Sequence, residues 1–222
     1  MFLSHFAVGL AAKRAAPAVS LGTLILACQF ADIIWPNFVL LGFEQLAIAP
    51  GITKVTPLDF ISYPYSHSLV ALTLWGIVVA GVYRLLRGRS ATTLTLIVIA
   101  GVVLSHWFLD VASHRPDMPL APGVGPKLGF ELWQSMPETL VVEFAMLAMG
   151  LRIYLGATQA RDRTGSIALW AMIGALIVLY LASVFGPPPP SPEAVAWSAE
   201  GVWLFVAWGY WIDRHRSARV RA

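Results

Sequence analysis

Charged residues are scarce in this sequence, and cysteine is almost missing. Only 12% of the 222 residues are Asp, Glu, Lys or Arg, against about 25% in ordinary soluble domains. So few charges cannot cover the surface of a soluble domain of this length, which excludes that class. The single cysteine, Cys28, lies in an apolar run. A disulfide within the chain is therefore excluded, and a buried, unreactive thiol is expected.

A basic stripe with interleaved aromatic residues is also missing, so nucleic acid is not expected as a partner. What remains is 58% hydrophobic, with nine Trp and six Tyr that suit the aromatic belts of a membrane protein. The lipid bilayer is the expected partner. Near the N-terminus, Lys13 and Arg14 follow the first apolar stretch instead of preceding it. This order is not that of a signal peptide, and a short retained helix is expected.

Long apolar runs separated by Pro, Gly and Arg predict membrane-spanning helices, each near the ~20 residues that a bilayer requires. The predicted fold class is all-α: a polytopic transmembrane bundle of about six spans plus a short N-terminal helix, forming one domain over residues 1–222. The first span is long enough to be tilted, or broken near Pro36. The predicted spans cover residues 18–42, 67–86, 92–113, 138–157, 166–185 and 194–212.

The basic residues predict the orientation of this bundle. Only Lys54, Arg115 and Lys127 fall in connections on one side of the predicted spans, and the other twelve of the 15 fall on the opposite side. By the positive-inside rule, both chain ends are then cytoplasmic. The twelve are Lys13, Arg14, Arg84, Arg87, Arg89, Arg152, Arg161, Arg163, Arg214, Arg216, Arg219 and Arg221.

Ionisable side chains within the predicted spans gather at one depth. Such side chains are costly in hydrocarbon and by default mark a functional site. The predicted orientation places them in the outer half of the membrane, whereas the inner halves of the spans carry few ionisable groups. They are Asp32, His67, His106, Asp110, Glu138 and Glu143, with His114 one turn beyond Asp110.

His106 and Asp110 form the sharpest local motif. Residues four apart share one helix face, with Cβ atoms ~6 Å apart, so both side chains can reach one cation. An imidazole nitrogen and a carboxylate oxygen suit zinc and tolerate manganese or iron. Asp32 and His67, at matching depth, would complete a tetrahedral site. The alternative is a hydrogen-bonded His106–Asp110 pair that holds the third span against its neighbours.

Four other residues are candidates with open alternatives. His5 is a further metal ligand if the N-terminal helix folds into the bundle, and otherwise an interfacial histidine. Glu143 is a candidate catalytic residue, acting behind the ligands or at a second metal, or else the partner of a basic residue on another helix. Arg115 and Lys127 could bind a substrate head group. For Arg115, a local contact with Asp117 is the alternative.

The order of these residues resembles that of the YdjM-like family of inner-membrane metal-dependent hydrolases. The resemblance covers roughly residues 5–117, and implies a bacterial inner-membrane location and hydrolase activity. It rests on the segments Ser4-His5-Phe6-Ala7-Val8-Gly9, Ser66-His67-Ser68-Leu69 and Ser105-His106, together with Asp32 and Asp110. The family pattern Asp-x-Asp-His stands here as Asp32-Ile33-Ile34-Trp35. One metal is therefore expected in place of two. More distantly, the order of His and Asp is similar to that of all-helical zinc phospholipases C and nucleases.

Three functions follow from these residues. The first is a metal-dependent hydrolase with His106, Asp110 and Glu143 as catalytic residues, acting on a lipid or a lipid-linked ester or phosphodiester. The second is a permease or a proton or metal relay, which requires polar residues to continue toward the cytoplasmic side. The third is a membrane scaffold in which the polar cluster joins helices without catalysis.

Overall fold

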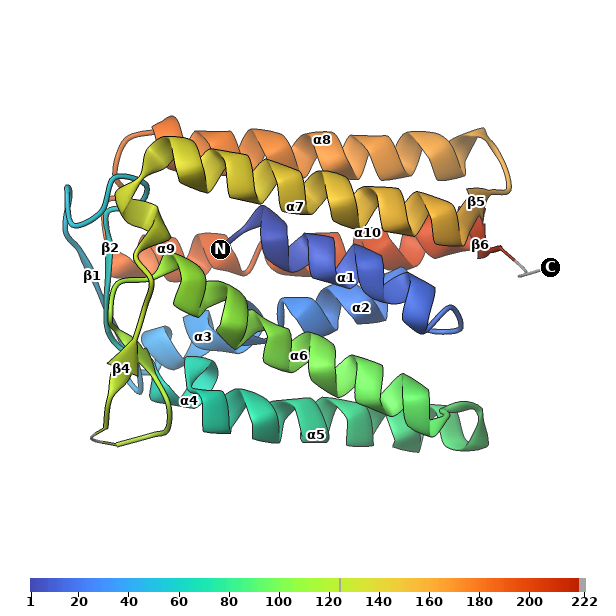
Figure 1. Ribbon diagram of the computed structural model, residues 1–222, viewed down its shortest axis with the longest axis horizontal. Helices are drawn as coiled ribbons and strands as arrows, with labels where there is room; N and C mark the ends of the chain where they lie inside the picture. The colour runs from blue at the N-terminus through green and yellow to red at the C-terminus, as the bar shows by residue number, and fades with distance from the viewer. Residues whose placement is uncertain (124, 220–222) are drawn as a thin grey trace.

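A computed structural model of the protein describes residues 1–123 and 125–219, and confirms a mostly helical fold whose long helices run side by side (Figure 1). Within these residues, four unbroken helices are long and apolar enough to cross a membrane. They are α5 (Leu69–Arg87), α6 (Thr93–Ser113), α7 (Met136–Ala157) and α8 (Arg163–Phe185). Three of them begin at a side-chain cap, in which Ser68, Thr92 or Asp162 accepts a hydrogen bond from a backbone amide of the first turn.

The first predicted span consists of α2 (Leu21–Cys28) and α3 (Phe30–Leu40), which meet at an angle of 52°. The break lies at Gln29, so the expectation of a break near Pro36 is wrong. Pro36 lies inside α3, where the side-chain amide of Asn37 donates to the carbonyl of Ile33 at 3.0 Å. Counted as one span, the bent pair raises the number of possible crossings among the described residues to five.

The sixth predicted span is interrupted, and the count of six is not confirmed. Residues 194–212 fall in α9 (Pro192–Ala199) and α10 (Val202–His215), separated at Glu200 and Gly201. The two helices have 8 and 14 residues, so each is shorter than the ~20 residues that a bilayer requires. The apolar composition of this region predicted a continuous helix, but glycine is a poor helix former, and at this junction the helix is broken.

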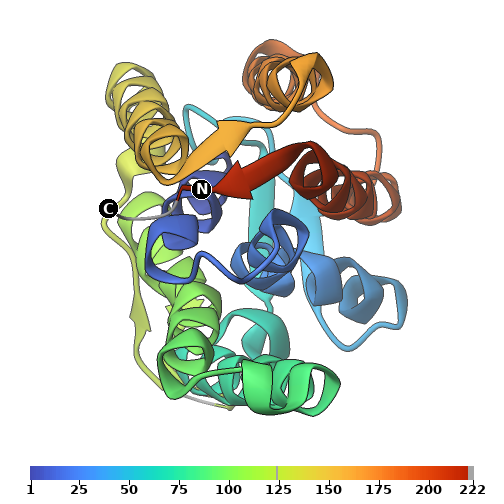
Figure 2. The ribbon, with the colours of Figure 1, turned by 90° about the vertical axis from the view of Figure 1, so that its right-hand side faces the viewer.

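Helix α1 (Leu3–Ala15) lies in the centre of the bundle, beside α2, α6 and α7 (Figure 2). Its buried residues include His5 and Phe6, whereas Arg14 is exposed at its end. The close approach of α1 and α7 depends on Gly150, since a Cβ there would lie 2.7 Å from the Cα of Ala7. The predicted short N-terminal helix is therefore present, and it is a core element.

Short structural elements close the two ends of the bundle. At one end, β1 (Gln45–Ile48) pairs antiparallel with β2 (Leu58–Ser62), and β3 (Met118–Pro119) pairs with β4 (Lys127–Leu128). At the other end, β5 (Thr158–Ala160) pairs with β6 (Arg216–Ala218), and the connection η1 (Gly88–Ser90) between α5 and α6 lies at this same end (Figure 1). The second end carries most of the basic residues counted above. Arg221 lies outside the described residues.

Candidate metal centre

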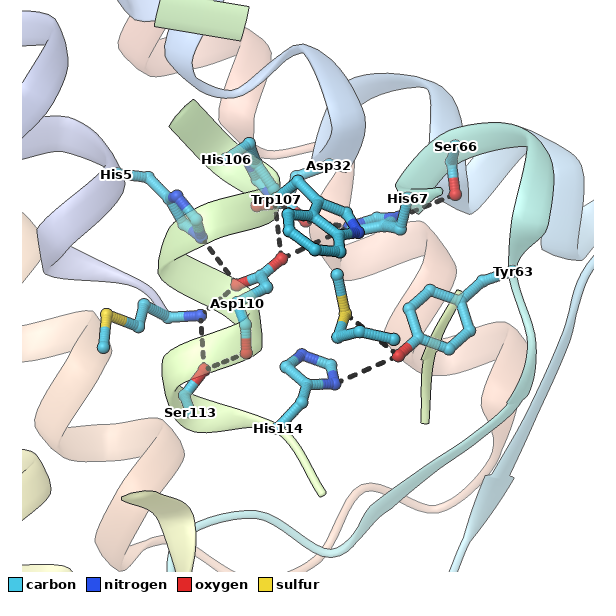
Figure 3. Close-up of polar contacts among 12 residues, drawn as sticks. His5, Asp32, Tyr63, Ser66, His67, His106, Trp107, Asp110, Ser113 and His114 are labelled. Atoms are coloured by element: carbon cyan, nitrogen blue, oxygen red, sulfur yellow. Dashed lines mark hydrogen bonds and ion pairs between the residues drawn. The ribbon is translucent and has the colours of Figure 1, made fainter. Parts of the chain in front are cut away.

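Five side chains from four helices converge near the end of the bundle that carries β1–β4 (Figure 3). They are His5 of α1, Asp32 of α3, His67 of α4 (Pro64–His67), and His106 and Asp110 of α6. All five were expected from the sequence as candidate ligands, and the structure brings them together. Four are buried, and only the Asp32 side chain is partly exposed, at 37%. The sets His5–Asp32–His106 and His67–His106–Asp110 could each hold a metal ion.

The separations between donor atoms match the size of a cation site. His106 Nε2 lies 3.1 Å from Asp110 Oδ2 and 3.7 Å from Asp32 Oδ1. His67 Nε2 lies 3.5 Å from Asp32 Oδ1 and 3.9 Å from Asp110 Oδ2. Ligand atoms bound at ~2.0–2.1 Å to a tetrahedral zinc lie roughly 3.3 Å from one another. The His106–Asp110 separation is close to this spacing and the other three are slightly wider, so the donor atoms lie near the spacing that zinc requires.

His5 extends this group through Asp110. Its Nε2 lies 3.0 Å from Asp110 Oδ1, and its ring stacks on that of His106 with centroids 3.7 Å apart. The amino group of Met1 also contacts Asp110 Oδ1, at 2.5 Å. His5 is thus placed either to hold the Asp110 carboxylate or to supply a fifth ligand. Its burial in α1 selects the first of the two sequence interpretations, in which the N-terminal helix belongs to the bundle.

Hydrogen bonds at Nδ1 aim two of the imidazoles at the shared space. His106 Nδ1 donates to the carbonyl oxygen of Cys28 at 2.9 Å. His67 Nδ1 donates to Ser66 Oγ at 2.7 Å, and that hydroxyl donates to the Glu44 carboxylate at 2.6 Å. A proton on Nδ1 leaves the lone pair on Nε2, which is the arrangement of a metal-binding histidine. Cys28 contributes through its backbone, while its thiol is buried as expected.

The buried nitrogen His106 Nε2 has no hydrogen-bond partner among the described residues. Asp110 Oδ2 lies nearby, but the geometry is not that of a hydrogen bond. A buried polar atom without a partner costs about 1–3 kcal/mol. A cation bound at this nitrogen would remove that cost, so the unpaired atom favours the metal interpretation over the simple His106–Asp110 hydrogen bond.

Glu44 is a part of the site that sequence reasoning missed. Besides Ser66 Oγ, its carboxylate accepts from the backbone amides of Tyr65 and Ser66, both at 2.8 Å, and so holds the helix that carries His67. The signal that could have found it is its isolation, because it is the one acidic residue within residues 33–58. Ser66 connects His67 to Glu44, whereas Ser68 forms the cap of α5.

Replacing Ser66 with Ala removes the acceptor of the His67 Nδ1 proton. We expect metal affinity to fall by roughly 10–100-fold, as is usual when an outer partner of a ligating histidine is lost. Competition with a chromogenic chelator measures this. Ser105→Ala is the control, since Ser105 Oγ only donates to the carbonyl of Val102 in its own helix. Equal affinities for the two variants would contradict this role of Ser66.

Glu143 lies beside the start of α1, where its carboxylate accepts from the amides of Phe2 and Ser4, both at 2.7 Å, and from Ser4 Oγ at 2.8 Å. These contacts hold the first turn of α1 and thereby position His5. They are neither those of a metal ligand nor those of an ion pair with a basic side chain. Glu138, by contrast, is exposed in the first turn of α7.

Glu143→Gln keeps the size of this side chain but turns one acceptor into a donor that faces backbone N–H groups. We expect the free energy of unfolding to fall by about 1–3 kcal/mol, because a buried donor is left unpaired. Denaturation in detergent measures this loss. Glu138→Gln is the control, and an equal effect there would show that the bonds to α1 are unimportant.

His114 lies one turn beyond Asp110, with its Nδ1 2.9 Å from Asp117 Oδ1. Tyr63 donates to the same oxygen at 2.6 Å, and the Trp133 ring lies 4.3 Å from the His114 ring. Burial lowers the pKa of His114, against the raising effect of its hydrogen bond to Asp117. A neutral imidazole therefore lies next to the metal-ligand cluster. The sequence did not assign Tyr63 to this contact.

The two residues expected to bind a head group have different surroundings. Arg115 forms an ion pair with Asp59 at 2.6 Å and lies 3.7 Å from Asp117, so the local contact considered as the alternative is present. Lys127 is exposed in β4, with Nζ 3.5 Å from the carbonyl of Ile61. Neither residue lies among those lining the cavity described next.

A cavity of about 790 Å³ leads to the cluster. At its polar end are Asp32, His67, Asp110 and His114. The rest is lined mainly by apolar side chains of α1, α8 and α10, together with the end of α9. A molecule that enters this cavity can reach the partly exposed Asp32 carboxylate.

In comparisons with known proteins, no family model, no curated protein and no solved structure matches the chain. The resemblance to the YdjM-like family therefore stays a prediction from the residues quoted above.

Proposed function

We propose that the protein is a membrane-embedded, zinc-dependent hydrolase whose site lies in the outer half of a bacterial inner membrane, with both chain ends cytoplasmic. The observation that carries the proposal is the convergence of five side chains in two three-residue sets that share His106, namely His5–Asp32–His106 and His67–His106–Asp110. Among the described residues, His106 Nε2 is buried and unpaired. Three imidazoles and two carboxylates form a donor set suited to zinc, and the two negative charges balance a divalent ion.

A divalent ion in this site would act as a Lewis acid and lower the pKa of a bound water toward neutrality. The chain itself holds the ligands in place, through Cys28 O behind His106 and Ser66 behind His67. Asp32, reached through the cavity, marks the side from which substrate would approach. The neutral His114 lines the same cavity, where it can accept or donate a hydrogen bond.

The position of the site supports a substrate that comes from the membrane. A lipid, or a lipid-linked ester or phosphodiester, would place its polar group at the outer depth predicted for the cluster. A relay or permease receives less support, because it needs polar groups that continue toward the basic end of the bundle. Residues 6–12 of the central helix α1 carry no ionisable side chain.

The proposal is tested by supplying purified protein with phospholipids and acyl esters in mixed micelles and measuring released head groups and fatty acids. We expect hydrolysis that is lost after dialysis against a chelator, restored by zinc and missing from His106→Ala. The control is Ser105→Ala, which should keep full activity. If zinc-loaded protein cleaves none of these substrates, or if His106→Ala cleaves them as wild type does, the hydrolase proposal fails.

A further inference from the structure

The cavity that ends at the metal-ligand cluster changes character along its length. Beyond the polar end it is lined by Phe2 and Phe6 near the start of α1, by Ala175 and Val178 of α8 and by Phe205 of α10. Its volume of about 790 Å³ lies within the roughly 300–1,000 Å³ typical of ligand sites. An apolar cavity of this size suits hydrocarbon better than water, since its walls offer few hydrogen bonds.

The apolar part of the cavity reaches the outer surface of the bundle. Val178 of α8 and Leu204 of α10 line the cavity, yet they are 65% and 72% exposed. Helix α8 is one of the helices apolar enough to cross a membrane, so in a bilayer the exposed Val178 side chain would face lipid. The cavity therefore has a mouth at the exposed side chains of α8 and α10, which in a bilayer would open sideways toward lipid.

The interrupted helix α9–α10 belongs to this mouth. Ala199 and Gly201, on either side of the break at Glu200, line the cavity. A continuous helix with large side chains here would place more atoms next to α8. The break that shortens the sixth predicted span thus coincides with the passage from bilayer to cluster.

We propose that this cavity binds one hydrocarbon chain of a phospholipid, which enters sideways between α8 and α10 while the polar head lies at Asp32, His67 and His114. That the bound lipid is also a substrate rests on the proposed function, but the binding itself does not. The polarity of the cavity changes along its length as the polarity of a phospholipid does. The charged and imidazole groups meet the head, and the apolar walls of α1, α8 and α10 meet the chain.

Photo-crosslinking tests the proposal without any need for catalysis. The probe is a phosphatidylglycerol with a diazirine near the head-group end of one acyl chain, incorporated into phosphatidylcholine vesicles with the full-length protein. Phe6 and Phe205 line the cavity but are only 1% and 8% exposed. We expect label in the peptide of α1 that contains Phe6, because a chain in the surrounding bilayer cannot reach this central helix.

Ala175→Trp fills the cavity from α8, and Ala199→Trp fills it from α9. Both variants should lose the label on α1 while keeping the label on exposed surfaces. Ala171→Trp is the matched control, since it lies one turn away on α8, is exposed and does not line the cavity. Thermal denaturation shows which variants are folded. Two blocking positions are used so that the test still holds if one of these variants does not fold.

The outcomes separate this proposal from the hydrolase. Label on α1 in wild type that both cavity variants lose supports the lipid site, even where the protein holds no zinc or cleaves nothing. The proposal is overturned if wild type carries no label on α1. It is also overturned if neither Ala175→Trp nor Ala199→Trp reduces that label, even where zinc is bound. His106→Ala should keep the label, because the His106 side chain does not line the cavity.

Discussion

Asp110→Ala is expected to abolish stoichiometric metal binding. Asp110 contacts the other candidates on both of its oxygens, with His5 at 3.0 Å from Oδ1 and His106 at 3.1 Å from Oδ2. The substitution removes one of two negative charges from a buried site that must balance a divalent ion. Losing an outer partner of a ligand usually costs about 10–100-fold in affinity, so losing this ligand should cost ~100-fold or more.

Elemental analysis and chelator competition on purified protein measure this effect. Thermal stability gives a second measure, because a ligand present at 100 times its Kd stabilises the folded state by about 2.7 kcal/mol. Added zinc should therefore raise the Tm of wild type and leave that of Asp110→Ala unchanged. Ser105→Ala, on the same helix, should behave as wild type. A variant without Asp110 that still holds one zinc per chain would show that the ion binds elsewhere.

Gly150→Leu is expected to have the largest effect on stability. A side chain at this position would meet the backbone of Ala7, where α1 and α7 are in contact. Neither backbone can move without disturbing the bundle, and overpacking of this kind costs about 1–3 kcal/mol or more. Because α1 carries His5, its displacement should also weaken metal binding.

Gly156→Leu provides the matched control for Gly150→Leu. It makes the same substitution on α7, and a Cβ at Gly156 meets nothing within 4 Å. Denaturation in detergent should show a large loss for Gly150→Leu and little change for Gly156→Leu. Equal stability of the two variants would mean that α1 is not held tightly against α7.

The sequence predicted which side chains come together, because their signals were local or shared one depth. His106 and Asp110 are four apart on one helix, and Asp32 and His67 were assigned to the same half of the membrane. Glu44 could not be assigned, because its role depends on how the segment after α3 folds back against α4. The periodicity of polar residues along one helix cannot reveal a contact between two separate segments such as these.

The fold was predictable as a class, and less so in its details. Long apolar runs indicate α5 to α8 reliably, since each run matches a continuous helix of 19 or more residues. The breaks at Gln29 and at Glu200–Gly201 were missed, because hydropathy is the same for a broken and an unbroken helix. Both breaks lie next to the cavity. Departures from regular structure are expected at functional sites.

X-ray absorption at the zinc edge of the purified protein tests the central claim most directly, since it reports the atoms bound to the ion. The account predicts about four or five nitrogen and oxygen ligands at ~2.0–2.1 Å, with the multiple-scattering pattern of imidazole. Zinc missing from the protein, or a sulfur ligand at ~2.3 Å from Cys28, would contradict a site built from Asp32, Asp110 and the three histidines.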